Sequence, residues 1–250
     1  MALFESSGDA LRHASKVFAE LAGQLGSASD DQSLQVVAEV AAARVTEARW
    51  ASITTVHGTE FRTSASTDET ALRADKIQYE MGTGPCLDAI VDDTVYNPQD
   101  LRHDDRWPEL GRRLADEVGI GSMLSFRLAT DGEQMAGGLN LYSDRPHGFG
   151  DESVALGLLL ATHAAAIVAL RANRARAEGL QEALQSNRDI GVAIGVLMSA
   201  YKVTRDEAFN LLRIASQSSN RKLRDIALDV AETGALDLGA VRRESRRTAR

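Results

Sequence analysis

Residues 186–234 read SNRDIGVAIGVLMSAYKVTRDEAFNLLRIASQSSNRKLRDIALDVAETG, and this stretch decides the fold of the C-terminal part of the chain. Its apolar residues recur at helical spacing, which predicts three helices joined by short turns. Thr204, followed by Glu207 three positions later, has the capping-box pattern of a helix start. Asn220 is a candidate cap for the third helix, and Gly234 lies just past its end. The predicted buried face of the second helix is Ala208, Phe209, Leu211, Leu212 and Ala215. A unit of about fifty residues has a thin core, so we expect it to need a partner.

Three segments of this stretch resemble the ANTAR family, a bacterial RNA-binding antitermination module. They are AIGVLM (193–198), DEAFNLLRIAS (206–216) and NRKLRDIA (220–227), and together they span all three predicted helices without a gap. The resemblance implies an all-α three-helix bundle that binds paired hairpins in a leader transcript and so prevents a terminator from forming. Family members often have Lys or Arg between the Ala and Gly of the first segment. This chain has Ile194 there, so we expect one basic contact of the family to be absent.

RNA hairpin loops offer splayed bases and clustered phosphates, which proteins bind by stacking, by hydrogen bonds and by Arg or Lys. The candidate RNA-binding residues are Arg188, Ala193, Gly195, Tyr201, Lys202, Arg213, Arg221, Lys222 and Arg224. The small residues of this set allow close approach either of RNA or of a second helix. Arg221 and Lys222 are expected at a helix start, where free amides also favour phosphate.

The charge of the chain is divided unevenly. Residues 1–170 contain 13 Lys/Arg and 26 Asp/Glu, a net charge of −13, whereas residues 171–250 contain 15 and 10, a net charge of +5. Such asymmetry favours phosphate binding by the C-terminal part. The alternative is that these basic residues only solvate helical faces. The end of the chain, residues 237–250, is a basic tail that we expect to be disordered, with phosphate contact as a secondary role.

A 3–4 spacing of residues runs from Leu156 to Met198, and no proline follows Pro146. This pattern predicts one long coiled-coil helix that pairs two copies of the chain as a homodimer. The seam residues are Leu156, Leu159, Leu170, Leu180 and Leu184, with the polar members His163, Asn173 and Asn187 fixing the register. The alternative is an ordinary amphipathic helix folded back on a sheet.

The N-terminal part alternates predicted helices and strands, which suggests a mixed sheet covered by helices. The main predicted strands are 50–56, 60–65, 121–129 and 135–142, the last two turned at Asp131-Gly132. Five segments resemble a GAF domain of the kind found in front of ANTAR modules: GTGPCLDAI (82–90), RWPEL (106–110), SMLSFRL (122–128), GGLNLYS (137–143) and HGF (147–149). The resemblance implies a sensor for a small molecule, but GAF domains bind many ligands or none, so ligand and cofactor stay unknown.

Together the two resemblances imply an α+β GAF sensor domain followed by a long coiled-coil helix and an all-α three-helix ANTAR bundle. The expected divisions are an N-terminal helix (1–27), the sensor (28–150), the coiled coil (151–185), the ANTAR domain (186–236) and the tail (237–250).

Cys86 follows Gly-Thr-Gly-Pro at a predicted helix start and is the candidate residue of the sensor pocket. A helix start stabilises a thiolate, which suggests a redox or ligand-sensing thiol. We favour a small buried residue instead, because cysteine is commonly buried and the sequence has no second thiol to resolve a sulfenate. A sensor protein whose helical C-terminus serves only for assembly therefore remains the alternative function.

Catalytic and metal-binding patterns are missing from the sequence. The five histidines form no pair at metal-ligand spacing, and no phosphate loop, GxSxG or HExxH motif occurs. We therefore expect no enzyme and no metal site. The apolar stretch 154–170 is short for a bilayer span, and the N-terminus has no signal-peptide pattern. We expect a soluble cytoplasmic protein without membrane contact.

Overall fold

The computed structural model describes residues 2–29, 32–92, 94–128 and 137–236, with side chains at position 12 and from 14 onward. The chain divides into two compact units, residues 1–173 and 174–250. Each unit is described by itself. The division falls within the predicted coiled-coil segment 151–185, inside a helix that contributes to both units.

The first unit is a five-stranded sheet covered by helices. Its helices are α1 (Ala2–Ser27), α2 (Ser33–Arg44), α3 (Glu69–Met81), α4 (Pro85–Asp92), α5 (Pro108–Val118) and the first part of α6 (Asp151–Tyr201), with a 3-10 turn at Leu101–His103. Its strands are β1 (Trp50–His57), β2 (Glu60–Ser66), β3 (Val95–Tyr96), β4 (Ser122–Leu128) and β5 (Gly137–Ser143). The order is β2-β1-β5-β4-β3, and every described pair is antiparallel, so the predicted mixed sheet is wrong. The predicted turn at Asp131-Gly132 lies outside the described residues.

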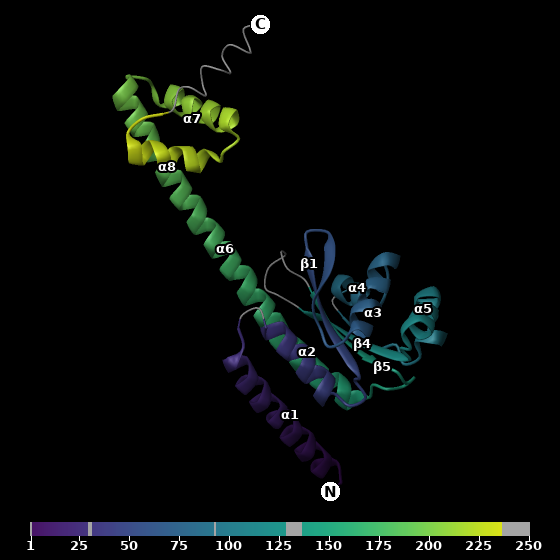
Figure 1. Ribbon diagram of the computed structural model, residues 1–250. Helices are drawn as coiled ribbons and strands as arrows, with labels where there is room; N and C mark the ends of the chain where they lie inside the picture. Colours follow the sequence, from purple (N-terminus) through teal and green to yellow (C-terminus); the bar gives the residue numbers. More distant parts are fainter. Residues whose placement is uncertain (1, 30–31, 93, 129–136, 237–250) are drawn as a thin grey trace. The chain divides into compact units, whose positions relative to one another are not determined.

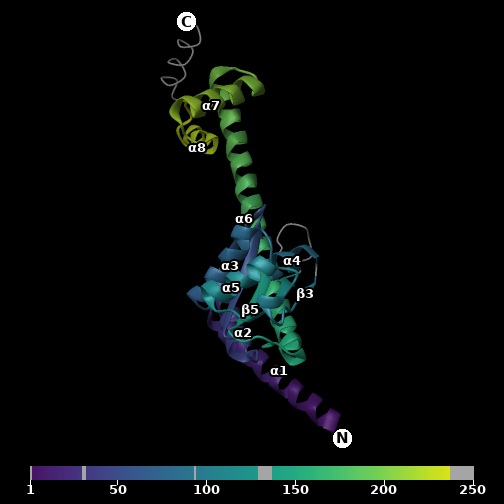
Figure 2. The ribbon, with the colours of Figure 1, turned by 90° about the vertical axis from the view of Figure 1, so that its right-hand side faces the viewer.

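Two cores form on opposite faces of the sheet because successive side chains of a strand point to opposite sides. On one face, apolar residues such as Ile53, Phe126 and Leu141 pack against α1, α2 and α6. On the other face, Met123 and Tyr142 pack against α3, α4 and α5. Figure 1 shows these helices on the two sides of the sheet, and Figure 2 looks onto the α3–α5 side. The α3–α5 side is also the side that carries polar strand residues.

The Gly-Thr-Gly-Pro segment is a turn that starts α4. Gly82 ends α3 with a left-handed φ of 66°, and Gly84 has a φ of 145°. A Cβ on Gly84 would lie 2.5 Å from the side-chain oxygen of Gln78, so only glycine fits this close approach. Pro85 then opens α4, as predicted, and the turn delivers Cys86 to the sheet.

Helix α6 confirms the predicted single helix through residues 151–201. It is also the one described helix that is long and apolar enough to cross a membrane, judged by length and composition alone. Its apolar side, however, is part of the core: Leu160 and Val168 are fully buried on the sheet, and a Cβ on Gly157 would lie 2.5 Å from the Phe126 ring. Core helices of soluble proteins pass the same test, so this apolar stretch is weak support for a membrane span.

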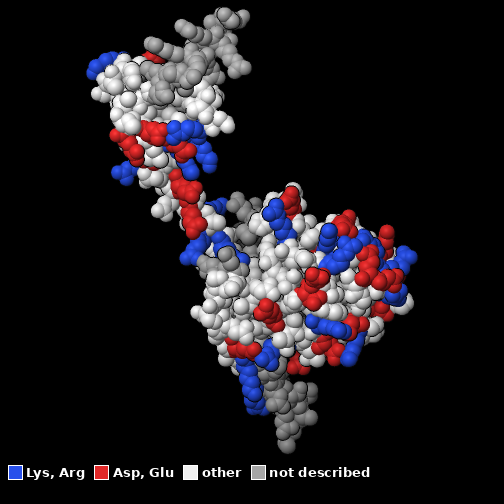
Figure 3. All heavy atoms as spheres, in the orientation of Figure 1, with Lys and Arg blue, Asp and Glu red and all other residues white. Residues whose placement is uncertain are grey.

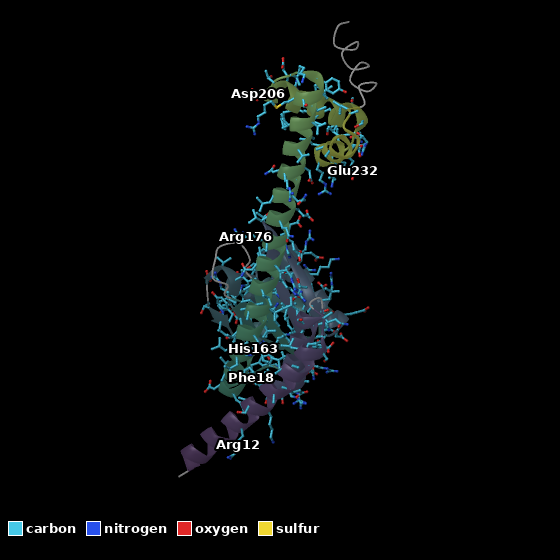
Figure 4. All side chains as sticks on the ribbon, turned by 90° about the vertical axis from the view of Figure 1, so that its left-hand side faces the viewer. Arg12, Phe18, His163, Arg176, Asp206 and Glu232 are labelled. Atoms are coloured by element: carbon cyan, nitrogen blue, oxygen red, sulfur yellow. The ribbon has the colours of Figure 1, made fainter. Side chains whose placement is uncertain are left out.

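The predicted seam of α6 is only partly on the surface. Leu156 is 6% exposed and belongs to the core of the first unit, so its assignment to the seam is wrong. The other four seam leucines, Leu159, Leu170, Leu180 and Leu184, are exposed. The His163 ring lies 4.8 Å from the Phe18 ring of α1, measured between centroids (Figure 4). Four of the five predicted seam leucines are therefore at the surface of the described residues.

The second unit is a helical bundle made of the end of α6, α7 (Arg205–Ser219) and α8 (Leu223–Thr233). Its buried core includes Ala193, Ile194, Leu197, Ala208, Leu212, Ala215, Ile226, Ala227 and Val230. The predicted capping box is confirmed: the Glu207 amide donates to Thr204 Oγ1 at 3.4 Å, and the Thr204 amide donates to the Glu207 carboxylate at 2.8 Å. Gly234 ends α8 in the left-handed conformation, also as predicted.

Two predictions for this bundle are wrong. Phe209 is 42% exposed rather than buried, because the stripe of Ala208, Leu212 and Ala215 already covers the contact face of α7. Asn220 does not cap the start of α8. It ends α7 with a left-handed φ of 53°, a conformation that asparagine tolerates well, and Lys222 occupies the N-cap of α8.

Candidate functional site

The polar face of the sheet meets α3 and α4 in a connected set of hydrogen-bonding side chains, which we name the Asp75 network. Its members are Ser52 and Thr54 of β1, Thr63 of β2, Asp75 and Tyr79 of α3, Cys86 of α4, and Asn140 and Tyr142 of β5. All except Thr63 and Tyr79 are fully buried. Polar side chains at these strand positions break the apolar pattern of a core, and they mark this as the candidate sensor site.

Asp75 is the centre of the network. Its carboxylate accepts hydrogen bonds from Ser52 Oγ at 2.8 Å and from Thr63 Oγ1 at 2.7 Å. Asn140 Nδ2 donates to the same carboxylate at 3.3 Å, and the Tyr142 hydroxyl donates to it as well. Burial raises the pKa of the Asp75 carboxyl to about 6, because desolvation outweighs the lowering effect of these four donors. Asp75 is thus a buried acid with no basic partner among its hydrogen bonds.

Cys86 joins the network through its thiol. Its thiol donates to Thr54 Oγ1 at 3.4 Å and accepts from Asn140 Nδ2 at 3.1 Å, while its amide donates to Gln78 Oε1 at 3.0 Å. Burial, and then the charge of Asp75, raise the pKa of the Cys86 thiol to about 12. A thiol of this kind stays protonated and reacts poorly, which supports the buried interpretation over a redox role.

Two buried polar atoms beside the network have no hydrogen-bond partner among the described residues: Asn140 Oδ1 and Ser125 Oγ. Ser125 of β4 and Asn140 of β5 are register neighbours, so their side chains stand on the same face of the sheet. Buried polar groups are nearly always paired. These two unpaired atoms on neighbouring strands are therefore candidate partners for a small hydrogen-bonding ligand. Sequence reasoning singled out only Cys86 here, although polar residues alternating through β1 and β5 were a readable signal.

Metal chemistry has no support in the part of the chain that the structure describes. No group of three or more His, Cys, Asp or Glu side chains could hold an ion there. His103 pairs with Asp100 at 2.8 Å on an exposed turn. The arrangement is an ordinary surface contact.

The predicted RNA-binding residues of the second unit are mostly at the surface. Arg188, Gly195, Tyr201, Lys202, Arg213, Arg221, Lys222 and Arg224 are exposed. Ala193 is fully buried against α7 and α8, so its assignment to the RNA surface is wrong. Ala193 lies on the same buried face of α6 as Leu197, four residues later, and packs in the core of the bundle. Gly195 is open instead: nothing lies within 4 Å of the position that a Cβ would take.

Several of the cations are engaged with neighbouring acids or amides. Arg221 pairs with Asp229 at 2.7 Å, and Arg224 lies 3.5 Å from Asp225. Arg213 donates to Asn210 Oδ1 at 2.8 Å. On the side of the C-terminal helices that Figure 3 shows, basic and acidic side chains lie next to one another.

Unpaired cations also occur. No ion pair of Arg188, Lys202 or Lys222 occurs among the described residues. Residues 186–236 contain seven Lys/Arg and six Asp/Glu, so most of the positive excess of the C-terminal part lies in residues 237–250. Any phosphate binding by the bundle itself must therefore depend on where the cations lie, not on total charge.

Comparison with known families covers both units. Residues 27–169 match the GAF domain, and residues 178–230 match the ANTAR domain. Comparison with curated proteins finds no match.

Solved structures resemble the first unit. One is the GAF domain of a phosphoenolpyruvate-protein phosphotransferase from Coxiella burnetii, at 20% identity and a TM-score of 0.51, covering 68% of this chain and 98% of that one. Another is a type II free methionine-R-sulfoxide reductase from Thermoplasma acidophilum, at 17% identity and a TM-score of 0.46, covering 56% and 92%. At 20% identity, the likeness to the Coxiella burnetii domain shows the fold alone. Since the GAF match covers more than half of the chain and the ANTAR match covers the helices that follow, this chain belongs to the GAF domain family and has the GAF–ANTAR architecture.

Proposed function

We propose that this protein is an RNA-binding regulator of transcription antitermination, whose ANTAR bundle binds paired hairpins in leader transcripts under control of the GAF sensor. The ANTAR match over residues 178–230 carries the proposal, because it spans nearly the whole bundle. ANTAR domains bind RNA, GAF domains act as sensors, and this combination belongs to regulators rather than enzymes. The proposal accordingly includes no catalytic step.

The cations of the bundle fit a phosphate-binding role. Arg188 on α6, Lys202 just after the end of α6 and Lys222 at the start of α8 are exposed and have no acidic partner among the described residues. Unpaired cations of this kind release counterions when they meet phosphates, which is the main sequence-independent source of RNA affinity. Tyr201 and Phe209 are partly exposed and offer rings on which bases stack.

The Asp75 network is the proposed sensor site. Its hydrogen-bonding groups are one carboxyl, hydroxyls, one thiol and amides, with no Arg, Lys or His among them. A buried carboxylate repels phosphate and favours neutral or cationic groups. The ligand class supported here is therefore a small uncharged or cationic molecule, and its unpaired partners would be Asn140 Oδ1 and Ser125 Oγ.

Pairing of two chains through α6 completes the proposal. Leu180 and Leu184 are each 62% exposed, and with Leu159 and Leu170 they keep the spacing of a coiled-coil seam. A homodimer brings two bundles to two hairpins, which fits paired RNA targets. The proposed location is the cytoplasm, where nascent transcripts are made.

The rival function, a redox sensor with a helical tail for assembly only, has little support. Cys86 is fully buried and its pKa is raised, so it lacks the exposed, low-pKa thiolate that redox sensors use. The ANTAR match also gives the helical part a role of its own.

The test is binding of the full chain to stem–loop RNA, measured by fluorescence anisotropy over a range of KCl concentrations. Lys222→Glu should weaken binding and reduce the log–log salt slope by about 0.7 for each phosphate that the variant no longer neutralises. Lys76→Glu is the matched control, because Lys76 is exposed on α3 of the sensor and the change in net charge is identical. Wild-type protein that binds stem–loops no better than unstructured RNA of equal length would refute the function.

A further inference from the structure

A cavity of about 260 Å³ lies between α7, α8 and the residues that follow α8. Its walls are mainly apolar, formed by Ala215, Ile226, Val230, Ala235 and Leu236, with the hydroxyl residues Ser219 and Thr233 among them. Arg221 and Asp229 also line it, and both side chains are about half exposed, so they form its rim. The cavity lies wholly within the second unit and is separate from the Asp75 network.

The size of the cavity limits what it accepts. Sites for drug-sized ligands measure about 300–1,000 Å³, so this one suits a single planar ring system rather than a whole cofactor. Apolar walls favour the faces of such a ring, and a polar rim favours its edge. A nucleobase has this distribution of apolar faces and hydrogen-bonding edge.

The rim offers donors and an acceptor side by side. Arg221 Nη1 donates to Asp229 Oδ2 at 2.7 Å, and the structure gives the other guanidinium N–H groups and Asp229 Oδ1 no partner among the described residues. The backbone of Arg221 is held by Ser216, whose hydroxyl donates to the Arg221 carbonyl at 2.6 Å. A purine matches this pair, because its ring nitrogens, and in guanine the carbonyl oxygen, accept from a guanidinium, while its amino group, and in guanine the ring N–H, donates to a carboxylate.

We infer that this cavity binds one unstacked purine base from the loop of an RNA hairpin. Arg221 and Asp229 read the edge of the base, and the apolar walls hold its faces. The neighbouring Lys222 and Arg224 are exposed on the same turn and supply charge for the flanking phosphates, which favours a base within RNA over a free metabolite. The inference rests on the proposed RNA-binding function and names the part of the RNA that is read.

The Asp229→Asn variant tests this inference, because the direction of its change in RNA affinity distinguishes hydrogen bonding to a base from charge repulsion of the RNA backbone. If Asp229 only repels the RNA backbone, removing its charge strengthens binding. If it accepts hydrogen bonds from the base, the variant should bind about 5- to 150-fold more weakly, the range of a good base contact. Asp225→Asn is the matched control, because Asp225 lies on the same helix, also lies beside an arginine, and does not line the cavity.

The probe is a pool of stem–loop RNAs with randomised loops, selected on the full wild-type chain. In the selected hairpins, each loop purine is replaced in turn by an abasic site. We expect one such replacement to weaken binding as much as Asp229→Asn does, with no further loss when both are combined, because the two changes remove one interaction. Arg221→Lys, which keeps the charge but not the planar fork, should weaken the same hairpin.

The possible outcomes distinguish a failure of base binding by the cavity from a failure of the proposed RNA-binding function. If wild-type protein enriches no hairpin, the proposed function itself fails. If hairpins are enriched but Asp229→Asn binds them as tightly as the Asp225→Asn control, the cavity does not read a base. Additive losses for the abasic site and Asp229→Asn would likewise overturn the inference. Circular dichroism of each variant checks that the bundle is folded. We expect the variants to fold, because an exposed ion pair contributes little to stability.

Discussion

Replacing Asp75 by asparagine should remove one pH-dependent contribution to the stability of the sensor unit. Asp75 is fully buried, and burial raises the pKa of its carboxyl from an ordinary value of 3.8 to about 6. The folded protein therefore holds a proton on Asp75 more tightly than the unfolded chain does. By linkage, this group stabilises the fold fully below pH 3.8, and that stability is lost as the pH rises through 6.

The full contribution of Asp75 to the free energy of unfolding follows from the difference between its two pKa values, since each tenfold change in proton affinity equals about 1.4 kcal/mol. It amounts to about 3 kcal/mol between strongly acidic and neutral conditions, of which about 1.4 kcal/mol falls between pH 5 and pH 8. Other carboxyls of the first unit act in the opposite direction. Salt bridges and hydrogen bonds lower the pKa of Glu20, Asp68 and Glu117, for example. Only the difference between wild type and Asp75→Asn isolates the Asp75 contribution.

Urea unfolding followed by tryptophan fluorescence measures this difference cleanly, because both tryptophans, Trp50 and Trp107, belong to the first unit. The free energy of unfolding of wild type, relative to Asp75→Asn, should fall by about 1.4 kcal/mol from pH 5 to pH 8. Asparagine also forms fewer hydrogen bonds, which lowers stability at every pH but leaves this trend unchanged. Parallel pH profiles for the two proteins would refute the burial argument, and a relative gain in wild-type stability with rising pH would reverse its sign.

Three further predictions follow from other parts of the structure. Replacing Leu180 and Leu184 by glutamate should give a monomer in sedimentation with unchanged sensor fluorescence, whereas a persistent dimer would place the interface elsewhere. Cys86→Ala should leave RNA affinity indifferent to peroxide, as in wild type, and a peroxide response in wild type alone would overturn the buried interpretation. Thr204→Ala removes the capping box of α7 and should destabilise the bundle by about 1 kcal/mol, seen as a lower melting temperature in circular dichroism.

The sequence predicts best the features that local chemistry determines. The capping box at Thr204 and the start of α4 after Gly-Thr-Gly-Pro depend on residues within a few positions of one another, and both are confirmed. Strands β1 and β2 are likewise readable, because β-branched residues flank a turn at Gly58. The long helix α6 follows from sustained periodicity without proline.

Features that depend on which faces meet are harder to predict. Phe209 looks like a core residue by type, yet the smaller Ala208 takes the contact face of α7. Ala193 looks like a surface residue for close RNA approach, yet it packs in the core. Asn220 has a side chain suited to either end of a helix, and only the backbone conformation decides which. The Asp75 network is harder to predict because its members come from five separate elements, and the alternating polar residues of β1 and β5 are only a partial signal for it.

The two faces of the sheet argue for sensing over mere scaffolding. The face toward α2 and α6 is mainly apolar, and the buried hydroxyls of Thr55 and Ser122 that lie on it have hydrogen-bond partners, which is what stability alone requires. The face toward α3 and α4 instead buries Asp75 and its donors and leaves Asn140 Oδ1 and Ser125 Oγ without partners among the described residues. Buried polar groups are costly unless every member is satisfied, so apolar residues of equal size would make a more stable domain. Because this costly arrangement occurs on one face only, next to the glycine turn that starts α4, we expect a binding site within this second core.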